Sequence, residues 1–280
     1  MNICLFTESE IALPLPKHDE RTQHIVKVLH KGVGDTFDAG IIGGAAGVAT
    51  ITKIGLKGEP DEGALYFDFV PQGEGKPLYP LTMIIGFPRP IQLRRLLRDV
   101  AGLGVCAVHL TGTELGDKSY LKSTVVEKGA AYQMLLDGTA QAASTHVPEL
   151  FMHATLRECL EAVQAEYAAR ADANTCAKIA LDNVRPASSL HEFLYGARAH
   201  ADCAHAHDRQ LVAPDTQSIA PATQNVIAAI GSERGWTDKE RTLLEQNGFV
   251  RCGMGVRVLR TETAATVAGA IILDAMGYCQ

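Results

Sequence analysis

Several features are missing from this sequence of 280 residues, and each absence excludes a class of protein. None of its seven cysteines forms a Cys-x-x-Cys motif, which argues against a disulfide framework and favours free thiols in a reducing compartment. The first ten residues lack the basic and then apolar pattern of a secretory signal. The longest apolar-rich run, residues 41–51, is rich in glycine and too short to span a bilayer. We therefore expect a cytoplasmic protein without a membrane segment.

Three further absences concern charge and binding motifs. Positive charge is in deficit, with a net charge of −6, so a nucleic-acid partner would need a local basic face. A Rossmann fingerprint is missing as well, because the glycine-rich residues 40–47 lie among β segments, and this argues against a Rossmann-type methyltransferase or dehydrogenase. The histidine-rich residues 200–208 have no established zinc spacing, so the sequence predicts no metal site there or elsewhere.

The first part of the chain has the pattern of a small β domain. Short apolar pieces alternate with Gly, Asp and Pro turns at residues 25–29, 36–37, 41–42, 48–54 and 64–70. Close spacing without helices predicts a small antiparallel barrel over residues 1–72. Residues 71–77 contain two glycines and two prolines and are interpreted as a linker.

From residue 78 onwards, strand patterns alternate with helix patterns. The expected strands are residues 81–86, 105–110, 177–181, 225–230 and 249–250. The expected helices are residues 91–103, 121–136, 150–170, 239–246 and 264–276. This alternation predicts an α/β domain over residues 78–280, with a parallel sheet covered by helices on both faces.

A glycine-rich loop, Gly231-Ser-Glu-Arg-Gly-Trp236, follows one of these strands. Thr237 and Glu240 have the spacing of a capping box, so a helix is expected to start directly after the loop. Gly231 and Gly235 allow backbone amides to approach a ligand closely, although a plain strand-to-helix turn is the alternative. Trp236 either stacks on a base or packs the loop on the core.

A second loop, Met254-Gly-Val-Arg-Val-Leu-Arg260, follows the last strand. Arg257 and Arg260 lie three residues apart beside a glycine turn, where they can grip a carboxylate or a phosphate, unless they are a plain surface pair. Thr261 or Thr263 is expected to cap the last helix, with Glu262 in its first turn.

The order of these motifs carries a family resemblance. The chain resembles the RsmE-type ribosomal RNA uridine N3-methyltransferases of the SPOUT superfamily in three motifs that occur in order. These are Gly-x-Glu-x-Gly, then Gly-Phe, and then Met-Gly-x-Arg-Val-Leu-Arg-Thr-Glu-Thr-Ala, which ends at Ala264. The resemblance covers nearly the whole chain. It implies an N-terminal PUA-like RNA-binding barrel and a C-terminal SPOUT α/β domain with a deep trefoil knot. It further implies a homodimer, S-adenosylmethionine bound in the knot with S-adenosylhomocysteine as product, and ribosomal RNA or the small ribosomal subunit as partner.

The resemblance also implies roles for particular residues. Residues in three loops that follow strands would bind the cofactor: Asn183, Gly231, Glu233, Gly235, Met254, Gly255, Val258 and Leu259. Arg257 and Arg260 would stabilise negative charge on the uridine, and Glu262 or a water would take its N3 proton. The RNA-facing arginines would be Arg89, Arg94, Arg95 and Arg98 on one helix, for which a solvated helix face is the alternative.

The chain also departs from the family pattern. Gly231-Ser-Glu-Arg-Gly235 replaces Gly-Pro-Glu-Gly-Gly, and Gln141-Ala-Ala-Ser replaces Gln-x-x-Arg before Val-Pro-Glu149. The second change concerns RNA contacts more than the cofactor. Two alternatives therefore stay open: a non-catalytic RNA-binding protein that retained the fold, and a methyltransferase of this superfamily that acts on another RNA position.

Overall fold

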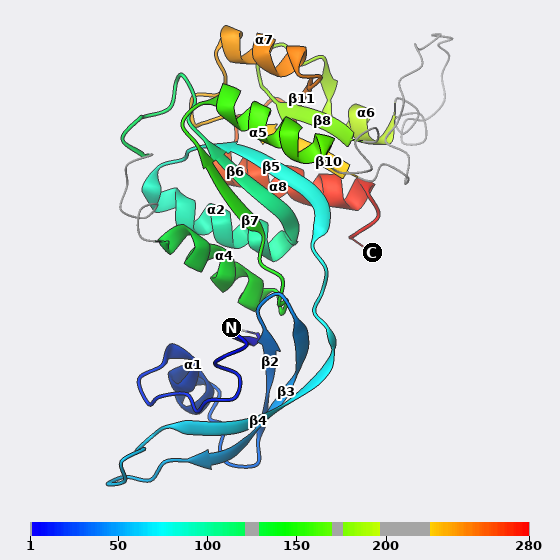
Figure 1. Ribbon diagram of the computed structural model, residues 1–280. Coiled ribbons are helices and arrows are strands. Elements are labelled where there is room, and N and C mark those ends of the chain that lie inside the picture. Colours follow the sequence, from blue (N-terminus) through cyan, green and yellow to red (C-terminus); the bar gives the residue numbers. More distant parts are fainter. Residues whose placement is uncertain (1, 121–128, 170–175, 197–224, 280) are drawn as a thin grey trace. The chain divides into compact units, whose positions relative to one another are not determined.

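The computed structural model describes residues 2–120, 129–169, 176–196 and 225–279 (Figure 1). Residues 121–128, where a helix was predicted, and the histidine-rich residues 200–208 lie outside the described part. Contacts divide the chain into two compact units: Met1–Leu78 with Gln133–Val147, and Tyr79–Tyr132 with Pro148–Gln280. No helix in the described part is both long and apolar enough to cross a membrane.

The first unit contains a four-stranded sheet in the order β1-β2-β3-β4. Its strands are β1 (Cys4–Phe6), β2 (Thr36–Ile41), β3 (Ala45–Ile54) and β4 (Leu65–Glu74). β2, β3 and β4 pair antiparallel, as predicted, whereas β1 was not predicted and pairs with β2 in parallel. Within the described residues these pairings form an open series, so closure into a barrel stays a prediction.

Residues 25–29 are helical, and their interpretation as a strand is wrong. Asp19 caps α1 (Glu20–Gln23), with its side chain accepting a hydrogen bond from the amide of Arg21. The chain then continues into a π-helical turn, η1 (His24–Val28). Ile25 is fully buried in the core of this unit from that turn. The β-branched composition suggested a strand, but the cap sets the local conformation.

The linker predicted at residues 71–77 begins later than expected, because β4 reaches Glu74. Pro71 lies opposite Gly47 at an irregularity in the β3–β4 register, on the edge strand, where the missing N–H of a proline is tolerated. A Cβ atom on Gly47 would lie 2.1 Å from the carbonyl oxygen of Val70. Glycine at this position therefore permits the close approach of the two strands.

Most of α4 (Ala130–Gln141) belongs to the first unit, although the sequence placed residues 133–147 in the second domain. The backbone amides of Asn2 and Ile3 both donate to the carbonyl of Ala140 at 3.2 Å. Ala140 is buried with Ile3 and Leu5 in a small apolar cluster. The helix completes this part of the core, and local periodicity cannot reveal such a long-range contact.

The second unit contains seven strands in the order β7-β6-β5-β10-β8-β11-β9, and every pairing is parallel. This confirms the predicted α/β architecture. The strands are β5 (Tyr79–Gly86), β6 (Val105–Thr111), β7 (Glu149–His153), β8 (Cys176–Leu181), β9 (Ser188–Ser189), β10 (Asn225–Ile230) and β11 (Val250–Gly253). The helices are α2 (Pro90–Leu103), α5 (Leu156–Ala168), α6 (Leu190–Tyr195), α7 (Asp238–Gln246) and α8 (Thr261–Ala275).

Helices cover both faces of this sheet (Figure 1). α2 and α8 pack against each other beneath β5 and β10, while α5 and α7 share a core with the opposite face. Leu93, Leu96 and Leu97 of α2 are at most 1% exposed, and burying each contributes about 2 kcal/mol. The predicted apolar face of this helix is therefore the one that meets the sheet.

One predicted helix, residues 150–170, is wrong over its first turn. β7 occupies Glu149–His153, and α5 starts at Leu156, where the Thr155 side chain accepts a hydrogen bond from the Glu158 amide at 3.2 Å. β7 lies at the sheet edge and is mostly exposed, so it lacks the apolar run of a central strand. β9 and α6 were not predicted either.

Candidate active site

Three loops meet at the carboxyl edge of the parallel sheet. Leu181, the last residue of β8, is in register with Ile230 of β10 and with Cys252 of β11, so the loops after these strands emerge side by side. They enclose a cavity of about 240 Å³. Seven of the eight predicted cofactor-binding residues line it, namely Asn183, Gly231, Glu233, Gly235, Met254, Val258 and Leu259. Gly255 is the eighth, and it lies in the same loop without lining the cavity.

The loop after β8 is fixed by a buried carboxylate. The side chain of Asp182 is only 3% exposed and accepts hydrogen bonds from Arg241 at 2.7 Å and from Arg251 at 3.2 Å. Its other oxygen accepts from the backbone amide of Val184 at 3.0 Å. The hydrogen bond to Asp182 raises the pKa of Arg241, so this guanidinium stays charged. The pair of arginines holds the loop that presents Asn183 to the cavity.

The loop after β10 is a tight turn that Gly231 and Gly235 make possible. The amide of Gly235 donates to the carbonyl of Ser232 at 2.8 Å, and Gly235 has a positive φ of 71°. A Cβ atom on Gly231 would lie 3.0 Å from the Cα of Gly235. Trp236 is 1% exposed and its indole N–H donates to the carbonyl of Leu181 at 3.0 Å. Of its two predicted roles, Trp236 therefore packs the loop on the core and ties it to the end of β8.

The loop after β11 carries apolar side chains into solvent. Gly255 has a φ of 94°, and Val256 and Val258 are 102% and 80% exposed. Thr261 is the first residue of α8, and its hydroxyl donates to the carbonyl of Gly231 at 3.2 Å. The prediction that Thr261 or Thr263 caps α8 is wrong, because Arg260 is the N-cap and makes no side-chain capping bond. Thr261 instead ties this loop to the loop after β10.

The three predicted catalytic residues take different positions. Arg257 lines the cavity and is exposed, while Arg260 is exposed at the start of α8. Within the described residues, neither guanidinium has an ion pair. Glu262 is 5% exposed in the first turn of α8, where the helix dipole favours a carboxylate. Arg257 thus brings a cation to the cavity, and Arg260 lies between two residues that line it, Leu259 and Thr261.

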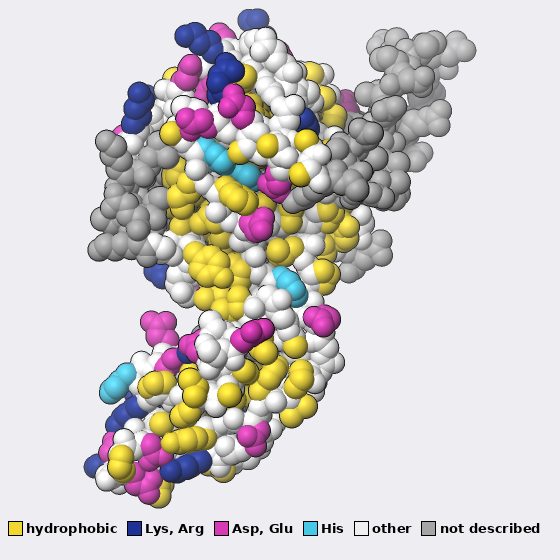
Figure 2. Space-filling view, viewed as in Figure 1, with side chains coloured by type: hydrophobic (Ala, Val, Ile, Leu, Met, Phe, Trp, Pro, Cys, Tyr) yellow, Lys and Arg dark blue, Asp and Glu magenta, His cyan; other side chains and the backbone are white. Residues whose placement is uncertain are grey.

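The predicted RNA-binding arginines lie on α2 or just before it, and all are exposed. Arg89 reaches the cavity loop, because its Nε donates to Oε2 of Glu233 at 3.0 Å. Arg95 lies 3.7 Å from Asp99, one turn later on α2, and Arg94 and Arg98 are on the same helix. Figure 2 shows basic side chains interspersed with acidic ones on the face drawn, in keeping with the net charge of −6.

A second and larger cavity, of about 1030 Å³, lies at the carboxyl ends of β5, β6 and β7. The buried carboxylate of Glu240 closes one side of it. Oε1 accepts from the amide of Glu114 at 2.8 Å, and Oε2 accepts from the amide of Thr237 at 2.9 Å, which confirms the predicted capping box. Sequence motifs did not indicate this cavity.

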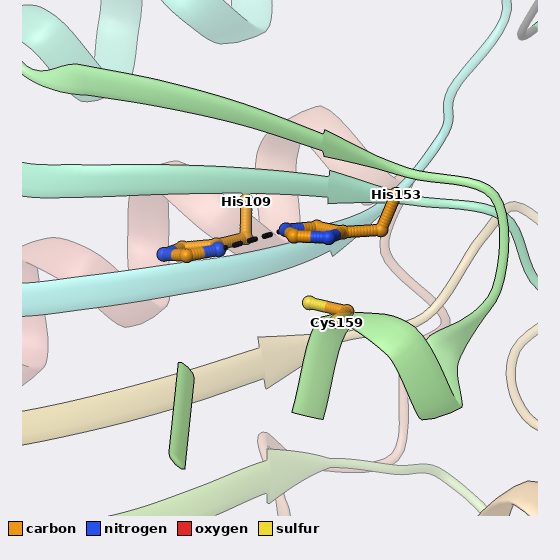
Figure 3. A group of neighbouring side chains, drawn as sticks. All are labelled: His109, His153 and Cys159. Carbon is orange, nitrogen blue, oxygen red and sulfur yellow. Dashed lines mark hydrogen bonds between the residues drawn. The ribbon is translucent and has the colours of Figure 1, made fainter. Parts of the chain in front are cut away.

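Beside this second cavity is a cluster of His109, His153 and Cys159, which sequence reasoning missed (Figure 3). His109 Nδ1 and His153 Nε2 are 3.0 Å apart and share a hydrogen bond. Burial, with the neighbouring His153, lowers the pKa of His109 to about 4, and burial raises the pKa of the Cys159 thiol to about 12. The three residues come from three different elements, so no local spacing could have indicated them.

Comparisons with known proteins identify the family of this chain. A family model described as an RNA methyltransferase domain matches residues 74–181 and 164–273. A Treponema pallidum protein named ribosomal RNA small subunit methyltransferase E is 37% identical over 276 residues, which cover 98% of this chain and 91% of the relative. A Borreliella burgdorferi protein named ribosomal RNA small subunit methyltransferase E 1 is 28% identical, with 97% of each chain covered.

The fold is shared with a solved structure. The crystal structure of a ribosomal RNA small subunit methyltransferase E from Neisseria gonorrhoeae, bound to S-adenosyl methionine, aligns with a TM-score of 0.66. The sequence identity is 18%, and the alignment covers 98% of this chain and 97% of the other.

Proposed function

Because this chain belongs to the ribosomal RNA small subunit methyltransferase E family, we propose that it transfers a methyl group from S-adenosylmethionine to N3 of a uridine in small-subunit ribosomal RNA. The family establishes an S-adenosylmethionine-dependent ribosomal RNA methyltransferase with a SPOUT fold. The choice of a uridine N3 as acceptor is the finer part of the proposal. The observation that carries the proposal is the cavity of about 240 Å³ where the loops after β8, β10 and β11 meet.

The residues around this cavity fit the proposed cofactor. Leu181, Ile230 and Leu259 provide apolar surface suited to an adenine ring. The tight turn from Gly231 to Gly235 brings backbone groups to the cavity without intervening side chains. We assign cofactor binding to the residues named from the sequence: Asn183, Gly231, Glu233, Gly235, Met254, Gly255, Val258 and Leu259.

The proposed mechanism relies on Arg257, which lines the cavity, and on Arg260 next to it. The cofactor supplies a methyl group on a positively charged sulfur, which is already activated for transfer. N3 of uracil must lose its proton, and Arg257 and Arg260 are available to stabilise the negative charge that develops on the base. We assign proton acceptance to Glu262, directly or through a water. Positioning of the acceptor against the donor supplies the rest of the acceleration.

RNA binding is assigned to the exposed arginines of the second unit and to the first unit. Arg89, Arg94, Arg95 and Arg98 give α2 a local basic face on a chain of net negative charge. Arg89 is also bonded to Glu233, so this face is continuous with the cofactor cavity. Residues 1–72, which lie within the first unit, are proposed to be a PUA-like RNA-binding barrel.

The exposed apolar loop supports a homodimer. Val256 and Val258 are the two most exposed apolar side chains beside the cavity, and covering them by a second copy would remove apolar surface from water. We further propose that the polypeptide is knotted within the α/β domain of residues 78–280 and that the protein acts in the cytoplasm. Light scattering during chromatography tests the dimer.

The function is tested by methyl transfer. The purified protein is incubated with S-adenosylmethionine and small ribosomal subunits from cells that lack the enzyme, and the RNA is digested and analysed by mass spectrometry. One 3-methyluridine per subunit is expected. A methylated nucleoside of another kind would support a different RNA position, and cofactor binding without any transfer would support a different substrate. A protein that binds RNA but not the cofactor would be the non-catalytic alternative.

A further inference from the structure

The cluster of His109, His153 and Cys159 lies away from the three loops of the methyl-transfer site. His109 is on β6, His153 ends β7, and Cys159 is in the first turns of α5. One ligand atom from each residue lies within 4.8 Å of the other two. Figure 3 shows the two imidazole rings almost coplanar and the sulfur directed towards them from the helix. His109 is 1% exposed and Cys159 is fully buried.

We propose that these three side chains bind a divalent transition-metal ion of the zinc class. Imidazole nitrogen and thiolate sulfur are the ligands that zinc prefers, and two histidines with one cysteine form a three-ligand set that leaves a fourth position for water. Ligands on one tetrahedral zinc ion lie roughly 3.3–3.7 Å apart. The two histidine nitrogens are 3.0 Å apart and would separate by a few tenths of an ångström, with the rings turning so that both lone pairs meet the ion. The cluster atoms lie within 4.8 Å of one another, so the sulfur would close in on the ion as well.

Metal binding would release one proton from the cluster, because a cysteine binds a metal as the thiolate and a histidine binds it through an unprotonated ring nitrogen. On binding, the S–H bond breaks, the sulfur electron pair forms the bond to the ion, and the proton leaves to solvent. The proton shared by the two rings moves to a ring nitrogen that does not face the ion.

A carboxylate lies beside the second ring nitrogen of His109, where it could accept that nitrogen's proton in a hydrogen bond. Oε2 of Glu166 lies 3.7 Å from Nε2 of His109, the nitrogen on the far side of the ring from His153. That nitrogen is buried and has no hydrogen-bond partner among the described residues. Metal-bound histidines commonly direct their second ring N–H to a carboxylate. With an ion on Nδ1, the remaining ring proton of His109 would lie on Nε2, on the side of this carboxylate.

The site also has an entrance. His153 is only partly buried and lines the cavity of about 1030 Å³ at the carboxyl ends of β5, β6 and β7. An ion can enter through that cavity, and a water from it can take the fourth position. Stacking of His109 on Phe151, with ring centroids 4.6 Å apart, holds the ring in place. The site would join β6, β7 and α5 beside the larger cavity.

The test uses the full-length protein after treatment with a chelator. Zn²⁺ is titrated by calorimetry, and Co²⁺ is titrated by absorbance, because a cysteine thiolate bound to cobalt gives an intense charge-transfer band. The wild type is expected to bind one ion and to show that band. His153→Ala and Cys159→Ser are expected to weaken Zn²⁺ binding at least about a hundredfold. This loss is larger than that usually caused by replacing a residue that contacts a ligand but not the ion.

Two controls separate this site from other ligands in the chain. Cys279→Ala removes an exposed thiol, and the double variant His205→Ala/His207→Ala removes imidazoles from the histidine-rich segment; both are expected to retain one ion. Thermal unfolding establishes that each variant is folded, and if Cys159→Ser does not fold, His153→Ala decides. The proposal is overturned if the wild type binds no ion. It is also overturned if both cluster variants bind as the wild type does, or if only the His205/His207 variant loses the ion.

Discussion

Arg89 donates a hydrogen bond from Nε to Oε2 of Glu233, with the two atoms 3.0 Å apart. The contact joins the N-cap of α2 to the loop after β10 that lines the proposed cofactor cavity. An arginine proposed to face RNA is thus directly bonded to a residue proposed to bind the cofactor. RNA that draws Arg89 away would leave the carboxylate of Glu233 free to turn towards the cavity.

Replacing Arg89 tests this link. The side chains of Arg89 and Glu233 are 64% and 33% exposed, so the ion pair contributes no more than about 1 kcal/mol. Arg89→Ala is therefore expected to change the Kd for S-adenosylmethionine measurably, but by no more than about fivefold, and to weaken RNA binding by a larger factor. Arg95→Ala is the matched control, because Arg95 contacts Asp99 and not the cavity loop. It should weaken RNA binding alone, and an equal effect of both variants on the cofactor would refute the link.

Removing the Thr261 hydroxyl tests the contact between two cavity loops. Thr261→Val leaves the carbonyl of Gly231 without its 3.2 Å partner in a buried position, at a cost of about 1–2 kcal/mol in the free energy of unfolding. Affinity for S-adenosylmethionine should fall several-fold, because the two loops are no longer tied together. Denaturant unfolding and calorimetry measure the two effects. Thr263→Val, at an exposed position of the same helix turn, should change neither quantity.

Asp182 is predicted to be a structural anchor of the cavity. Asp182→Ala leaves Arg241 and Arg251 without their shared partner, and the side chain it removes is 3% exposed, so the free energy of unfolding should fall by about 3 kcal/mol. Asp238→Ala removes the other carboxylate bonded to Arg241, whose side chain is 98% exposed, and should cost less than about 0.5 kcal/mol. Equal stabilities of the two variants in denaturant would contradict this assignment.

The first unit should be sensitive to acid through Asp19. Hydrogen bonding to Arg21 lowers the pKa of Asp19 below its usual 3.8 in the folded protein. The unfolded chain then binds the proton more readily, so the stabilisation is complete above pH 3.8 and is lost as the pH falls through the folded pKa. Asp19→Asn retains a capping side chain for α1 but should be less stable than the wild type at pH 7.

The difference between Asp19→Asn and the wild type should narrow as the pH falls below 3.8, and unfolding in urea at several pH values measures it. Asp38→Asn, at an exposed position on β2 of the same unit, is the matched control for the loss of one surface carboxylate. A gap that stays constant for Asp19→Asn from pH 7 to acid would show that the carboxylate charge has no part in stability.

Patterns that depend on neighbouring residues could be predicted from the sequence. The periodicity of Leu93, Leu96 and Leu97 gave the buried face of α2, and the spacing of Thr237 and Glu240 gave the start of α7. The loops around Gly231 and Gly255 could be named as a site because parallel strands end at one edge of their sheet. These features are determined by local chemistry and by a rule of topology.

Features that depend on distant contacts could not be predicted. β7 is an exposed edge strand without an apolar run, and α5 begins directly after Thr155. The sequence pattern therefore predicted one long helix over both elements. Ala140 accepts hydrogen bonds from the chain's second and third residues across more than 130 positions. His109 and His153 are 44 residues apart and meet only because β6 and β7 are neighbours.

The central claim is that the cavity between the loops after β8, β10 and β11 holds S-adenosylmethionine. Calorimetric titration of the cofactor into the wild type and into Gly231→Val measures it most directly, because a side chain at residue 231 would collide with the backbone of Gly235. The wild type is predicted to bind one molecule per chain, and Gly231→Val is predicted to remain folded and to lose at least about a hundredfold in affinity. Undiminished binding by Gly231→Val, or no binding by the wild type, would contradict the account.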